Sequence, residues 1–167
     1  ATMDIIITGD TLTAIINNTS PIDLDVPITG GEGNSPGITG FGFNLDPDWL
    51  LLDLWSLTAL TIDDDGVSNV ETIGGSSLAE GAWSLGSWLP SIALDYKPNN
   101  DGNIDGALFS PAAVGDDSLP GGQNDIYYTT ATLEMVFFGQ LPTLNTTDEW
   151  SPFVRMQNVG IDGEGSL

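Results

Sequence analysis

The negative charge of this chain is carried by aspartate and is almost unopposed. The sequence has 18 Asp and 6 Glu, which make up its 24 acidic residues, against Lys97 and Arg155 alone, for a net charge of −22 over 167 residues. Asp favours turns and caps over helix interiors, because its short side chain competes for backbone hydrogen bonds. The acid therefore marks loops and not charged helix faces, and the apolar runs between the loops decide the fold.

The first thirty residues contain the best hairpin signal. Residues 3–8 and 11–16 are β-forming runs that flank Gly9 and Asp10, a two-residue turn sequence. This spacing predicts a β-hairpin, because Gly and Asp tolerate the backbone conformations that such a tight turn requires.

The longest apolar run, residues 49–62, is the one segment where a helix competes with a strand. Asp48 could cap a helix there, but alternation of residue type from Leu52 to Ile62 favours a strand. Further strands are predicted at residues 22–28, 38–45, 126–138 and 152–159. Residues 67–93 show no clear pattern, and residues 106–125 predict a long loop.

About eight or nine short strands separated by Gly, Pro and Asp turns predict an all-β fold, an antiparallel β-sandwich or jelly roll with long loops. A length of 167 residues suits a single domain, residues 1–167. A chain this long can bury a core without disulfides. The absence of cysteine is therefore compatible with any compartment.

The charge balance excludes two classes of partner. Nucleic acid backbones and anionic membranes are bound by clustered Lys and Arg, and this chain has only two basic residues. The same surface attracts cations, and calcium takes oxygen ligands from Asp, Asn and backbone carbonyls. Salt also screens self-repulsion of this size. The acidity therefore predicts either calcium sites or adaptation to a saline medium.

Two Asx-rich segments are candidate calcium sites. The candidate ligands are Asn99, Asp101, Asn103, Asp105, Asp63 and Asp65. The first four follow the order of the middle of an EF-hand loop, but Lys97 stands where the first Asp ligand belongs, so the helical EF-hand is excluded. A calcium loop of another geometry and a solvated Asx turn are the alternatives for both segments.

The residue inventory leaves few enzymatic mechanisms. Without His or Cys the chain has no imidazole base, no thiolate nucleophile and no cysteine zinc site. The remaining mechanism is a carboxylate pair of the glycosidase kind. It needs two acidic side chains about 5–10 Å apart, one of them buried. Asp53 and Glu134 are the candidates on predicted strands, but nothing in their spacing singles them out, so we expect no enzyme. Arg155 lies between Val154 and Met156 on a predicted strand, and we expect it to form a cross-strand pair with a carboxylate such as Glu134.

The tryptophans raise the question of sugar binding, because carbohydrate-binding modules stack pyranose rings on exposed aromatic side chains. Trp83 and Trp88 lie in a Gly- and Ser-rich context, and Trp150 follows two acidic residues. These three residues are the candidate ligand-binding aromatics. The alternative is that they fill the core of the sandwich.

Three segments together resemble a known family. They are residues 5–20 (IIITGDTLTAIINNTS), 37–45 (GITGFGFNL) and 152–167 (PFVRMQNVGIDGEGSL). They look like the body of bacterial PEP-CTERM proteins, which are secreted, exosortase-sorted surface or matrix proteins. The resemblance implies an extracellular β-sandwich linked to the envelope or to exopolysaccharide, without a catalytic site. The Pro-Glu-Pro signal, apolar anchor and basic tail of that family are not among these residues.

The leading hypothesis is a non-enzymatic structural or matrix protein, extracellular or at the cell surface. It would self-assemble into a homo-oligomer, filament or layer and be stabilised by calcium. The alternative is a carbohydrate-binding module that binds polysaccharide through exposed tryptophans, and a carboxylate-pair glycosidase is the third hypothesis. Glycosylation sequons at Asn17, Asn18 and Asn145 fit an exported protein.

Overall fold

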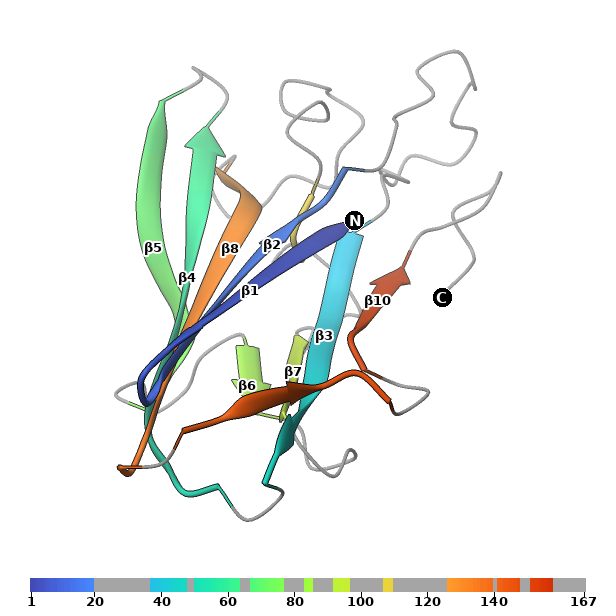
Figure 1. Ribbon diagram of the computed structural model, residues 1–167. Helices are drawn as coiled ribbons and strands as arrows, with labels where there is room; N and C mark the ends of the chain where they lie inside the picture. The colour runs from blue at the N-terminus through green and yellow to red at the C-terminus, as the bar shows by residue number, and fades with distance from the viewer. Residues whose placement is uncertain are drawn as a thin grey trace.

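The regular structure of the described residues consists of ten β-strands, and Figure 1 shows how they are arranged. The computed structural model describes residues 1–19, 37–47, 50–63, 67–76, 83–85, 92–96, 107–109, 126–139, 141–147 and 151–157. Across these ranges the strands form two antiparallel five-stranded sheets, consistent with the predicted β-sandwich. The same ranges contain no helix, and so none of the length and hydrophobicity needed to cross a membrane.

The two sheets mix early and late strands. The first sheet has the spatial order β1 (Thr2–Thr8), β2 (Thr11–Asn17), β8 (Ile126–Phe137), β4 (Leu52–Asp63) and β5 (Ser68–Gly75). The second sheet has the order β10 (Phe153–Gln157), β3 (Gly37–Asp46), β7 (Ile92–Tyr96) and β6 (Trp83–Leu85), and β9 (Thr143–Asn145) pairs with β3.

Most strands expected from the sequence are present. The hairpin is confirmed, since Thr8 pairs with Thr11 across the turn and Gly9 has a φ of 62°. From Leu52 onward the predicted run forms strand β4 and not a helix, because its position between β8 and β5 gives it a hydrogen-bonded ladder on both sides. The predicted strand at residues 22–28 lies outside the described residues.

The core lies between the sheets and follows the alternation of the strands. On β2, for example, Leu12, Ala14 and Ile16 are fully buried while the residues between them are half-buried. Strand β3 is buried on both faces. At Gly42 there is no room for a side chain, because a Cβ would overlap the Phe153 ring and the Ile92 carbonyl.

A short buried segment around Leu108 joins the two sheets. Leu108 exchanges backbone hydrogen bonds with Ile38 of β3, at 2.9 and 3.0 Å, and the Phe109 N–H donates to the Tyr128 carbonyl of β8 at 2.8 Å. The Leu108 carbonyl also accepts a 2.9 Å hydrogen bond from the side chain of Asn18, which is itself buried. Backbone groups that would be costly to bury unpaired are thus satisfied from both sheets.

The two lateral sides of the sandwich differ. On one side β5 contacts β6, and a Cβ added to Gly74 would lie 2.9 Å from the Trp83 carbonyl oxygen and 3.1 Å from the Trp55 ring. On the opposite side the edge strands are β1 and β10, which do not pair with each other.

Replacing Asn18 with Ala removes the side-chain donor to the Leu108 carbonyl. We expect the free energy of unfolding to fall by about 1–3 kcal/mol, the cost of a lost buried hydrogen bond, measured by urea denaturation. The Thr19→Ala variant is the control, since Thr19 is exposed and adjacent. If the Asn18→Ala variant unfolds at the wild-type urea midpoint, the stability of the buried segment around Leu108 does not depend on this side chain.

Candidate functional site

The predicted calcium ligands fall almost entirely outside the described residues. Asp63 is the last residue of β4, paired through its backbone with Ile126. The other five candidates, Asn99, Asp101, Asn103, Asp105 and Asp65, lie in ranges that the structure does not describe. Within the described part of the chain, no group of three or more acidic, His or Cys residues gathers in a way that could hold a metal ion. The calcium hypothesis therefore still depends on the loop sequences.

Trp83 is a core residue. It lies on β6, is 1% exposed, and packs its ring 5.6 Å from the ring of Phe41 at an interplanar angle of 43°. A ring in this position cannot stack on a sugar, so for Trp83 the core alternative holds and the ligand-binding assignment is wrong. Trp88 and Trp150 lie outside the described residues.

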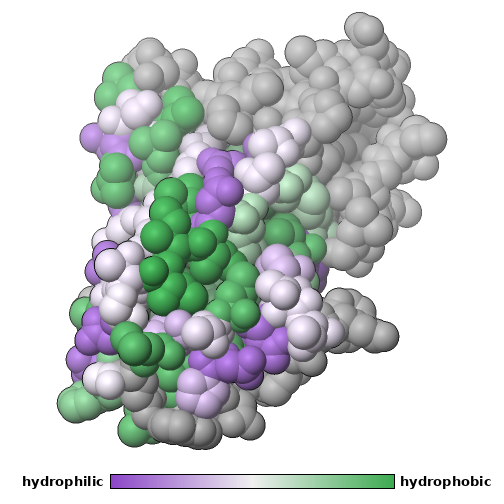
Figure 2. All heavy atoms as spheres, viewed as in Figure 1, coloured by the Kyte–Doolittle hydropathy of each residue, from purple (hydrophilic) through white to green (hydrophobic). Residues whose placement is uncertain are grey.

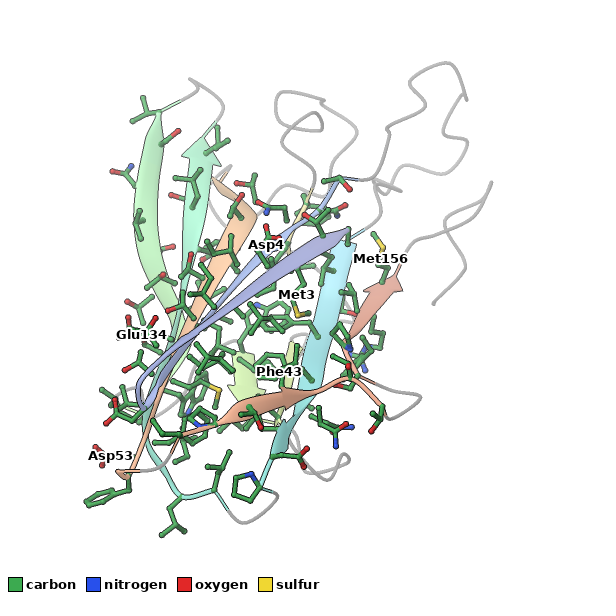
Figure 3. The ribbon with its side chains drawn as sticks, in the orientation of Figure 1. Met3, Asp4, Phe43, Asp53, Glu134 and Met156 are labelled. Carbon is green, nitrogen blue, oxygen red and sulfur yellow. The ribbon has the colours of Figure 1, made fainter. Side chains whose placement is uncertain are left out.

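The two candidate catalytic carboxylates lie on neighbouring strands but are both exposed. Glu134 on β8 stands opposite Ser56 of β4, and Asp53 lies at a register shift near the start of β4 (Figure 3 labels both acids). A glycosidase acid needs burial to stay protonated near neutral pH. This pair therefore lacks the environment that the mechanism requires.

Arg155 interacts with β3 and not with Glu134. Its Nε donates to the Thr39 hydroxyl at 3.2 Å and its Nη2 donates to the Thr39 carbonyl at 3.0 Å. Strand β10 pairs with β3 in the second sheet, whereas Glu134 lies on β8 in the first. The predicted cross-strand pair with Glu134 is wrong, because the sheet order separates these two strands.

The sequon at Asn18 is inaccessible in the folded protein. The side chain is 1% exposed and its Nδ2 is bonded to the Leu108 carbonyl. Glycosylation would require that same nitrogen, so the folded protein cannot be modified at Asn18. The neighbouring Asn17 is half-buried, and its Oδ1 accepts a 2.8 Å hydrogen bond from the Thr130 hydroxyl.

Exposed apolar side chains gather at one end of the sandwich, where β4 begins and β8 ends. Leu51, Phe138 and Leu141 are 64, 68 and 71% exposed, and Leu54 is also exposed. The Phe138 N–H donates to the Leu51 carbonyl at 2.9 Å, which holds the two segments together. We call these four residues the end patch. Sequence reasoning missed them, because an apolar residue at the end of a strand-forming run reads as core.

A second apolar surface follows strand β1. Figure 2 shows apolar atoms across the middle of the view, where β1 crosses the molecule in Figure 1. On this strand Ile6 is 56% exposed, while Met3, Ile5 and Ile7 are partly buried against the core. Asp4 is exposed on the same strand. The strand thus carries apolar side chains on both faces, with one carboxylate among them.

Replacing Trp83 with Ala should lower the free energy of unfolding by about 3–5 kcal/mol, because a large buried ring is lost. Chemical denaturation followed by circular dichroism measures this without using tryptophan fluorescence. The Trp83→Phe variant, which keeps an aromatic ring against Phe41, should recover a large part of the loss. A Trp83→Ala variant as stable as the wild type would mean that the ring is not packed in the core.

Comparison with known proteins gives no match: no family model fits the chain, and neither a curated protein nor a solved structure is significantly similar to it. The likeness to PEP-CTERM proteins therefore remains a resemblance carried by the three segments quoted above.

Proposed function

We propose that this protein is a non-enzymatic structural or matrix protein, secreted to the cell surface, that self-associates under the control of cations. The observation that carries the proposal is the end patch, an exposed apolar cluster on a chain whose net charge is −22. Apolar clusters of this kind mark interaction surfaces, because leaving them in water is unfavourable. The charge opposes association between copies until salt or divalent cations screen it.

The distribution of acid supports a structural role over a catalytic one. The described carboxylates of Asp4, Asp10, Asp53, Glu71 and Glu134 are all exposed, and they are spread over strands and turns. Such a surface keeps single copies apart at low ionic strength and lets them approach when cations accumulate. Trp83 lends no support to the carbohydrate-binding hypothesis, since its ring is buried.

Self-association should depend on ionic strength and on the end patch. Sedimentation velocity should show a shift to larger species between about 0.15 and 1 M NaCl, as the Debye length falls from about 8 to 3 Å. The Phe138→Ser/Leu141→Ser double variant should weaken association at least about tenfold, because burying one such side chain contributes about 1.5–3 kcal/mol.

The matched control for this experiment is Val70→Ser on β5. Val70 is 71% exposed, the same fraction as Leu141, but it lies outside the end patch. It should associate like the wild type. A protein that stays monomeric at every salt concentration, or equal losses in all variants, would contradict the proposed role of the end patch.

Calcium should stabilise the protein beyond its effect on ionic strength. We expect a higher unfolding temperature in millimolar calcium than in chelator with NaCl at matched ionic strength, because a ligand that binds only the folded state stabilises it. The Asp101→Asn/Asp105→Asn variant should lose this increment. The Asp4→Asn/Asp53→Asn variant, with the same change in charge, should keep it. If NaCl reproduces the whole effect, the acidic loops hold no specific calcium.

A further inference from the structure

The β1–β2 hairpin determines which backbone groups of β1 point away from the sheet. The two-residue turn closes on the pair Thr8 and Thr11, which is hydrogen-bonded in a hairpin of this length. Hydrogen-bonded and non-hydrogen-bonded pairs then alternate, so Met3, Ile5 and Ile7 each direct their N–H and C=O groups away from β2. Among the described strands β1 is the last in its sheet. These groups can therefore receive one more strand.

The side chains of the same three residues form part of the apolar surface at this edge of the sheet. Met3, Ile5 and Ile7 are partly buried against the core, and so are Val154 and Met156 of β10, the edge strand of the second sheet. Figure 3 labels Met3 and Met156 on these two strands. An added strand would place every second side chain over this apolar surface and cover it further. Strand β1 has no Pro, no Lys and no bulge, which are features that protect an edge from pairing, and Asp4 is the one charged residue along it.

The charge of the surroundings selects the chemistry of the added strand. Asp4 is exposed on β1, and the described residues of the first sheet also expose Glu71 and Glu134 but include no Lys or Arg. A second copy of this protein would bring another 24 acidic residues and a second Asp4 to the same edge. A segment that carries Lys or Arg is instead complementary in charge, and opposite charges directly across a strand pair are stabilising.

We propose that the outer edge of β1 accepts an extended segment of a basic partner protein as an additional antiparallel strand. The segment has apolar residues opposite Met3, Ile5 and Ile7, and a Lys or Arg opposite Asp4. Main-chain hydrogen bonds along the edge supply affinity, and the alternation of side chains supplies specificity. The proposal is independent of the proposed function, because the edge of β1 and the end patch are different surfaces.

A synthetic peptide tests the proposal on the intact chain. The probe is a fluorescein-labelled peptide of the sequence Val-Lys-Val-Lys-Val-Lys-Val, with binding measured by fluorescence anisotropy at 0.15 M NaCl. Its isomer Val-Val-Lys-Lys-Lys-Val-Val has the same composition and charge without the alternation, and it should bind at least about tenfold more weakly.

Backbone methylation of the peptide tests the hydrogen bonds. In the antiparallel arrangement the Val amides face Ile5 and its neighbours, whereas the Lys amides face solvent. Methylating the Val nitrogens should therefore weaken binding roughly tenfold or more, and methylating the Lys nitrogens should leave it nearly unchanged. Equal effects of the two methylation patterns would overturn the proposal.

Variants of the protein test the charge pair. Asp4→Asn should weaken binding of the alternating peptide about two- to fivefold, the range of one cross-strand charge pair. Asp53→Asn removes the same charge from an exposed site away from this edge and should change the affinity far less. If both variants and both peptide isomers behave alike, the attraction is non-specific and the proposal is wrong. It is equally wrong if the peptide does not bind and the protein instead pairs with itself through β1.

Discussion

The two sheets are held in a fixed relation by backbone hydrogen bonds that pass through the core. Leu108 bonds to Ile38 on β3, and Phe109, the next residue, bonds to Tyr128 on β8. Apolar packing alone does not specify direction, so a sandwich held only by side chains could tolerate sliding of one sheet over the other. Buried polar groups must meet their partners, which removes that freedom. The side chain of Asn18 donates a further hydrogen bond to the Leu108 carbonyl, which links the end of β2 to the same buried segment.

Repulsion between like charges, and not attraction, dominates the surface of the protein. A chain with 24 acidic and two basic residues has little opportunity for attractive ion pairs, and its net repulsion favours separation of copies. Apolar side chains that remain exposed on such a surface stand out against it. The end patch and the edge of β1 are two such places, and they differ in what they offer: side chains alone at the end, side chains together with backbone donors and acceptors at the edge. The two proposals therefore depend on different surface chemistry against the same charged background.

The sequence predicts the strands that carry a local signal. The hairpin, β3, β4, β8 and β10 were all expected, because local alternation or turn chemistry identifies them. Strand β5 was not, since its first five residues are all exposed and give no inward period. The burial of Leu108, within a stretch expected to be a long loop, was missed for another reason. It results from partners 70 and 20 residues away in sequence, Ile38 and Tyr128, and no local pattern reports them.

The candidate site was harder to predict than the fold. Whether Trp83 is inside or outside depends on which strand it faces, and Arg155 was assigned the wrong partner because sheet order is a long-range property. The exposure of Leu51, Phe138 and Leu141 could not be predicted for the same reason, because it too is a long-range property. An apolar residue at a strand end is buried or exposed according to what folds over it, and the sequence alone does not contain that information.

Arg155 has a consequence for the resistance of the protein to proteolysis. Proteases of the trypsin type cut after Lys or Arg, but cleave poorly when Pro follows. Lys97 precedes Pro98, so Arg155 is the main site in 167 residues. At Arg155 the guanidinium is bonded to Thr39 and the backbone is paired with β3. A protease must bind its substrate extended, with the basic side chain in its own pocket, so cleavage at Arg155 requires β10 to detach first. The scarcity of basic residues and the pairing of β10 with β3 therefore leave proteases of the trypsin type little to cut in the folded chain.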